Sequence, residues 1–97
     1  MRRPARGTMP NVRIPPPYRG PTQGTAEIQV EGEHALACLE SVDRKYPGFL
    51  AQVLDEDGNI HRFVKLFKNG DQLKGEALQE RLAENDDLEI VAAIAGG

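Results

Sequence analysis

The chain has 97 residues, 39% of them hydrophobic and 28% charged, with one cysteine and a formal net charge of −3. This length holds one small domain, a single cysteine excludes an internal disulfide, and the acidic balance argues against nucleic acid as the main partner. No apolar run approaches the length of a membrane span or a secretory signal. We therefore expect a cytoplasmic protein that binds neither nucleic acid nor membrane.

The amino-terminal third predicts a flexible extension followed by two strands. Residues 1–10 open with an Arg-, Pro- and Gly-rich stretch without apolar periodicity, which is typical of an unstructured extension. Val12 and Ile14 alternate with a polar residue and predict a first strand. Strict alternation over 25–31 predicts a second strand, and its closeness in sequence indicates an antiparallel hairpin.

A helix is predicted over 33–46, where apolar residues recur at helical spacing. Its apolar face comprises Ala35, Leu39, Val42 and Tyr46. Acidic Glu31 and Glu33 stand where the helix dipole favours negative charge, and basic Arg44 and Lys45 stand at the opposite end. Pro47-Gly48 ends the helix.

The second half of the chain predicts further strands and short turns. Residues 49–54 suggest one more helical turn, and 55–59 have the composition of a turn. Residues 63–68 predict a third strand, which Asn69-Gly70 connects to a short fourth strand near Leu73. Residues 77–83 predict one or two helical turns, and 88–94 the last strand. This order favours an α+β fold: a mixed sheet with one main helix packed on one face.

The last strand is followed by Ala95, Gly96 and Gly97. Two residues without side chains make a thin, flexible segment. Such a tail can enter a narrow active site in another protein and present its carboxylate there. The alternative is a frayed terminus without a function.

Four segments together resemble the ubiquitin-like β-grasp sulfur carriers of the ThiS/MoaD type: 12–15, 61–67, 85–90 and 94–97. The resemblance covers about residues 11–97, and the branch it looks most like is the CysO-like carrier of bacterial cysteine synthesis. It implies a β-grasp domain over 11–94 and a flexible tail over 95–97. Two departures from the family pattern are Asn85, where glycine is common, and Lys68, where an apolar residue is common.

The resemblance also implies a chemistry for the tail. In this family the carboxylate corresponding to Gly97 is adenylated by an E1-like, ATP-dependent activating enzyme. A sulfurtransferase or sulfide then supplies the sulfur of a terminal thiocarboxylate, which a cysteine-synthase-like enzyme accepts. Gly97 is thus the expected covalent site, with Ala95 and Gly96 as its tail. The chain itself is expected to be no enzyme and to hold no cofactor.

Alternation in the third strand separates two sets of side chains. Val64 and Leu66 are expected to face the helix, and Phe63, Lys65 and Phe67 the other side. Together with Ile94, these three are the expected partner-binding residues, since exposed aromatic side chains often anchor interfaces. The alternative for Phe67 is that it covers the sheet.

Other signals are weaker. Cys38 is expected to be a buried, inert thiol, and His34 and His61 lie too far apart in the sequence to predict a metal site. Two rival functions share the tail. One is a ubiquitin-like modifier joined to target lysines through Gly97. The other is a small subunit of a larger enzyme, as in molybdopterin synthase.

Overall fold

The computed structural model describes residues 9–15, 24 and 26–92. Its strands are β1 (Asn11–Arg13), β2 (Glu27–Gln29), β3 (Val64–Lys68), β4 (Asp71–Gln72) and β5 (Asp87–Ala92). They form one sheet in the order β2-β1-β5-β3-β4. β1 and β5 are parallel and the other neighbours are antiparallel. The predicted mixed sheet and the predicted β1–β2 hairpin are therefore confirmed.

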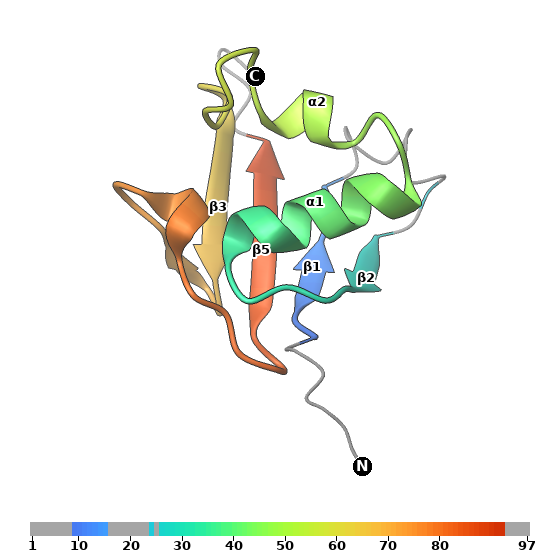
Figure 1. The fold of residues 1–97 in the computed structure, drawn as a ribbon. Helices are drawn as coiled ribbons and strands as arrows, with labels where there is room; N and C mark the ends of the chain where they lie inside the picture. The colour runs from blue at the N-terminus through green and yellow to red at the C-terminus, as the bar shows by residue number, and fades with distance from the viewer. Residues whose placement is uncertain (1–8, 16–23, 25, 93–97) are drawn as a thin grey trace.

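The helices are α1 (Ala35–Lys45), α2 (Leu50–Val53) and the single 3-10 turn η2 (Ala77–Gln79). Figure 1 shows α1 crossing one face of the sheet, with β1 and β5 behind it. The core lies between these two layers, because alternate strand residues point toward the helix. Its fully buried members include Val12, Ile14, Leu39, Val42, Phe49, Val53, Leu66, Leu88 and Ile90.

The start of α1 differs from the prediction. The helix begins at Ala35, its first turn holds no acidic residue, and Glu31 and Glu33 precede it. His34 occupies the N-cap position in an extended conformation, and its Nδ1 accepts a hydrogen bond from the backbone N–H of Ala37 at 3.2 Å. A side-chain acceptor at this position satisfies a helix N–H that has no partner within the helix. The expected acidic start was wrong because the imidazole takes the capping role.

The end of α1 is joined to α2 through one carboxylate. Asp43 Oδ1 accepts hydrogen bonds from the backbone N–H of Gly48 at 3.2 Å and of Leu50 at 2.9 Å. Gly48 has a φ of 103°, a conformation that few side chains tolerate. The predicted helix end at Pro47-Gly48 is thus confirmed, and Asp43 holds the turn that follows it.

The connection from β4 to β5 is tied to the start of α1. Only Ala77–Gln79 is helical within the predicted 77–83 segment. The next residues pair with the start of the helix instead: Ala35 N–H donates to the carbonyl of Glu80 at 2.9 Å, and Leu82 N–H donates to that of Glu33 at 3.0 Å. One helical turn is the outcome because these carbonyl and N–H groups bond to Ala35 of α1 and to Glu33 just before it.

Candidate functional site

β5 is the strand that leads toward the carboxyl terminus, and it lies in the middle of the sheet between β1 and β3. Leu88 and Ile90 are buried beneath α1, whereas Glu89 is exposed and Val91 half-buried on the opposite face. The strand is therefore paired on both sides and held in the core on one face. The predicted site residues Ile94, Ala95, Gly96 and Gly97 lie outside the described residues.

The face opposite α1 places two of the predicted partner-binding residues beside β5. Lys65 pairs in register with Val91, and Phe67 with Glu89. Lys65 is exposed and Phe67 is half-buried, so Phe67 partly covers the sheet while leaving part of its ring accessible. We name this region the exit patch and define it as Phe63, Lys65, Phe67 and Val91.

Phe63 precedes β3 and is the one large hydrophobic side chain among the described residues that is exposed, at 42%. The guanidinium carbon of Arg62 lies 5.2 Å from its ring centroid, a distance at which a cation attracts an aromatic face. The last described pair of the sheet is Val64 with Ala92. Phe63 thus lies at the end of the sheet from which β5 continues toward the tail.

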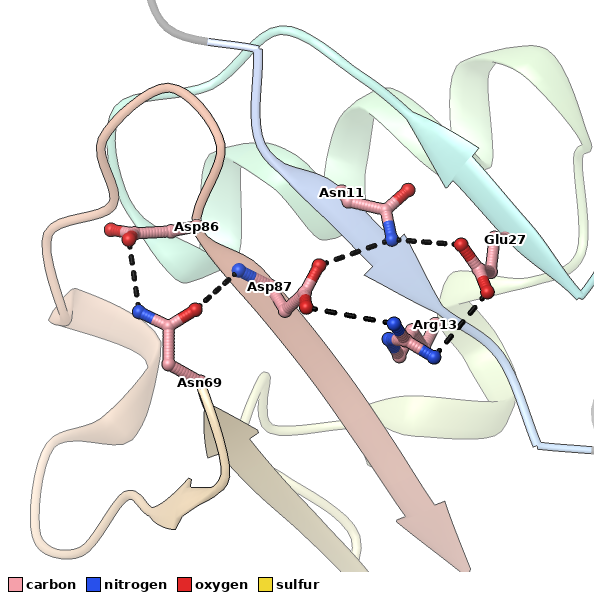
Figure 2. A network of polar contacts seen from close by, with 6 residues as sticks. All are labelled: Asn11, Arg13, Glu27, Asn69, Asp86 and Asp87. Carbon is pink, nitrogen blue, oxygen red and sulfur yellow. Dashed lines mark hydrogen bonds and ion pairs between the residues drawn. The ribbon is translucent and has the colours of Figure 1, made fainter.

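The other half of the same face carries a polar network that links β1, β2 and β5 (Figure 2). Arg13 forms ion pairs with Glu27 at 3.3 Å and with Asp87 at 3.6 Å. The side-chain amide of Asn11 donates to the carboxylates of Glu27 at 3.1 Å and Asp87 at 3.2 Å. The polar groups of this network are therefore bonded to one another within the chain, in contrast to those of the exit patch.

The turn between β3 and β4 is joined to the start of β5 by a second part of this network (Figure 2). The side-chain amide of Asn69 donates to Asp86 at 2.9 Å, and its oxygen accepts from the Asp87 N–H at 2.8 Å. The other carboxylate oxygen of Asp86 accepts from the Ala83 N–H at 2.8 Å. These two hydrogen bonds, first the one from Ala83 and then the one from Asn69, lower the pKa of Asp86 below its ordinary value.

The sequence predicted the turns of this region but missed the network. Asn69 has a φ of 51°, so the expected hairpin turn is confirmed, and Asn85, which stands where glycine is common in the family, adopts a left-handed backbone with a φ of 77°. The ion pairs of Arg13 become visible only with the strand order, because their partners are distant in sequence. The sequence signal for this network was that Arg13, Glu27 and Asp87 each occupy an outward-facing position on a different strand.

Lys68, the departure from the family pattern, has a definite role here. Its Nζ donates to Glu80 Oε2 at 3.1 Å and to the Arg81 carbonyl at 3.0 Å. The ammonium group thereby fastens the end of β3 to the segment that precedes β5. An apolar residue at this position would leave these interactions unmade.

The residues that gave weaker signals in the sequence, Cys38 and His34, both belong to the framework of α1. Cys38 is fully buried in α1, and burial raises the pKa of its thiol to about 11. The expected buried, inert thiol is confirmed as buried and poorly ionised. His34 is the cap of α1, and within the described ranges no group of three His, Cys, Asp or Glu residues is placed to hold a metal ion. Across the same residues, no helix combines the length and apolarity that crossing a bilayer requires.

Comparison with known proteins relates this fold to sulfur carriers, although no protein-family model matches the chain. A protein of Archaeoglobus fulgidus named as a sulfur carrier protein is 30% identical over 79 residues, which cover 77% of this chain and 86% of that protein. The crystal structure of the Amycolatopsis orientalis BexX/CysO complex contains a chain that is 27% identical, with a TM-score of 0.83 over 91% of this chain and 99% of that one. Mycobacterium tuberculosis CysO is 25% identical, with a TM-score of 0.81 over 88% of this chain and 99% of its own. The chain therefore belongs to the sulfur carrier family of β-grasp, ubiquitin-fold proteins.

Proposed function

We propose that this chain carries activated sulfur on Gly97 and delivers it in biosynthesis, with cysteine synthesis as the pathway. The observation that supports this most directly is the likeness to a named sulfur carrier over most of both chains. The similarity to CysO favours the cysteine branch. In this proposal the chain is a substrate of enzymes and performs no catalysis itself.

The tail chemistry begins from an unreactive carboxylate, whose leaving group in acyl transfer would be oxide. An oxygen of the Gly97 carboxylate attacks the α-phosphate of ATP, and pyrophosphate leaves. Sulfide, or the persulfide of a sulfurtransferase, then attacks the carbonyl carbon and AMP leaves, so that a thiocarboxylate remains once any persulfide bond has been reduced by a thiol. The ATP site belongs to an E1-like partner, because this chain contributes only the group that is activated.

The arrangement of β5 supports a tail that a partner handles while the body stays folded. The strand pairs with β1 over residues 87–89 and with β3 over residues 88–92, and Leu88 and Ile90 anchor it under α1. Interactions that hold a reacting group within reach of an active site reduce the entropy lost during reaction. A rigid strand directly before a short tail has this effect.

We propose the exit patch, extended by Ile94, as the docking surface for the activating enzyme. Phe63 supplies an exposed aromatic ring, Lys65 a charge that forms no ion pair with another described residue, and Phe67 a half-buried ring. Aromatic side chains surrounded by polar ones are typical of residues that dominate binding energy. The network around Arg13 offers less to a partner, because its polar groups already bond within the chain.

The tail is tested by incubating the protein with ATP, sulfide and the activating enzyme of the same cell, followed by intact mass spectrometry. The expected product gains the mass of one oxygen-to-sulfur exchange. Deletion of Gly97, or addition of one residue after it, should abolish that product while circular dichroism stays unchanged. A thiocarboxylate on the extended variant would contradict the proposal.

Docking is tested with Phe63→Ala and Lys65→Glu, using Lys45→Glu in the last turn of α1 as the charge-matched control. We expect kcat/KM for adenylation to fall about tenfold or more in the first two variants, equivalent to about 1.4 kcal/mol of binding energy. Lys45→Glu should behave as wild type. Equal activity of all three proteins would exclude the exit patch.

The fate of the thiocarboxylate separates the proposal from its rivals. Addition of a cysteine-synthase-like acceptor enzyme should return Gly97 to a carboxylate and leave the protein at its original mass. Covalent attachment of the chain to lysines of other proteins in the cell would instead show a modifier. Stable co-purification with one larger enzyme would show a regulatory or catalytic small subunit.

A further inference from the structure

The turn between β3 and β4 combines a labile dipeptide with a structural role. Asn69 and Gly70 are exposed, and their positive φ values of 51° and 91° are those of a two-residue hairpin turn. Asn-Gly suits this turn because both residues tolerate a left-handed backbone. The same dipeptide is chemically labile, because glycine has no side chain to hinder attack of its amide nitrogen on the asparagine side chain.

The hydrogen bonds of Asn69 oppose that attack in the folded chain. Its side-chain nitrogen donates to Asp86 and its side-chain oxygen accepts from the Asp87 N–H, so both ends of the amide are directed toward β5 (Figure 2). The backbone N–H of Asn69 also donates to the Asp87 carbonyl at 2.9 Å. Ring closure requires Cγ to turn toward the Gly70 nitrogen, which breaks the two side-chain bonds.

We propose that Asn69 is a covalent modification site, where deamidation is restrained by hydrogen bonds to Asp86 and Asp87 and, once it occurs, uncouples the β3–β4 turn from β5. The Gly70 nitrogen forms a bond to Asn69 Cγ, the carbon–nitrogen bond of the amide breaks, and ammonia leaves with the displaced proton. Water then opens the resulting succinimide at either carbonyl and yields aspartate or isoaspartate. No oxidant or reductant is involved.

The product destabilises the site that produced it. Aspartate at position 69 replaces the N–H donor with a carboxylate oxygen facing Asp86, whose own carboxylate accepts from Ala83. Two carboxylates at hydrogen-bonding distance repel each other, and the bond between them is lost. Isoaspartate also lengthens the backbone by one atom within a two-residue turn. Either product loosens the start of the strand that carries the tail.

The reaction is followed by peptide mapping of the full chain at mildly alkaline pH, with exposed Asn59 as the internal comparison because Ile60 follows it. In denaturant, Asn69 should deamidate faster than Asn59. In the folded wild-type protein, Asn69 should deamidate more slowly than it does in denaturant. Asp86→Ala should accelerate the folded-state reaction about tenfold, which corresponds to about 1.4 kcal/mol. Glu84→Ala, a loss of an exposed carboxylate in the same loop, should leave the rate unchanged.

The variant Val53→Ala, a core substitution outside the network, tests whether a lower overall stability is enough to speed deamidation without any loss of the hydrogen bonds to Asn69. If Asp86→Ala accelerates the reaction and Val53→Ala does not, the hydrogen bonds are the restraint. Equal acceleration in both, or equal rates in folded and denatured wild type, would overturn the proposal. The variant Asn69→Asp should also exchange the amide hydrogen of Asp87 faster than wild type, and unchanged exchange would contradict the uncoupling.

Discussion

At the scale of single residues, several polar side chains supply a hydrogen-bond partner to a backbone group that regular secondary structure leaves without one. His34 caps α1, Asp43 accepts from two N–H groups after it, and Lys68 reaches the carbonyl of Arg81. Backbone groups at the ends of helices and strands need such partners, because a group left unsatisfied away from water costs free energy. None of these roles follows from hydropathy, since each depends on where the backbone ends a regular element.

His34→Ala should destabilise the protein by about 1 kcal/mol, because the N–H of Ala37 loses its side-chain acceptor. His34→Asp should restore much of that loss, since aspartate is a strong N-cap residue and carries the charge that the helix dipole favours. Urea unfolding followed by circular dichroism measures both. His61→Ala, at an exposed residue, is the matched control. A wild-type midpoint for His34→Ala would show that the imidazole does not stabilise α1.

At the scale of elements, the contact between α1 and the segment before it is unusually close. A Cβ built on Gly32 would lie 2.7 Å from Cys38 Sγ and 2.8 Å from Cys38 N. The thiol could rotate, but the backbone nitrogen belongs to the helix and can move only with it. Gly32 therefore sets how near the chain passes to α1 on leaving β2.

Gly32→Ala should lower the free energy of unfolding by about 1–3 kcal/mol, because α1 must shift away from a packed core. The double variant Gly32→Ala, Cys38→Ala should recover only part of this loss relative to Cys38→Ala, since the clash with the backbone nitrogen remains. Thermal and urea unfolding of the four proteins gives the comparison. Full recovery would assign the effect to the thiol alone.

Element types were largely predictable from the sequence, and the site only in part. Alternation at Val12 and Ile14, helical spacing from Ala35 to Val42, and Asn69-Gly70 each specify local structure, and each prediction is confirmed. The acidic helix start was wrong because the helix begins at Ala35, after both glutamates, with His34 in the N-cap position. The network around Arg13 required the pairing of β1 with β5, which joins residues far apart in sequence. The predicted tail, from Ala95 to Gly97, stays a prediction.

At the scale of the whole molecule, the Asp86 carboxylate, directly before β5, makes the fold sensitive to acid. Asp86 accepts from Ala83 and Asn69, and its pKa is lowered from an ordinary value of 3.8. A lowered pKa means that the folded chain binds fewer protons than the unfolded chain over that range. This stabilisation is present above pH 3.8 and is lost as the pH falls through the lower, folded-state pKa.

Asp86→Asn should be less stable than wild type near neutral pH, and the difference should shrink as acid protonates Asp86. Urea midpoints of the two proteins between about pH 5 and pH 2 test this. Asp57→Asn, at an exposed residue outside the network, controls for the loss of one negative charge. A constant difference across this range would show that Asp86 acts without titrating.

The position of β5 has a mechanical consequence. A strand at the edge of a sheet can be peeled off one hydrogen bond at a time, but β5 has a neighbour on each side, one parallel and one antiparallel. A pull along the axis of β5 would load its pairing with β3 over residues 88–92 and with β1 over residues 87–89 in shear. An unfolding enzyme that pulls on the carboxyl end of this chain would therefore meet its greatest resistance at the first step, before any other element had unfolded.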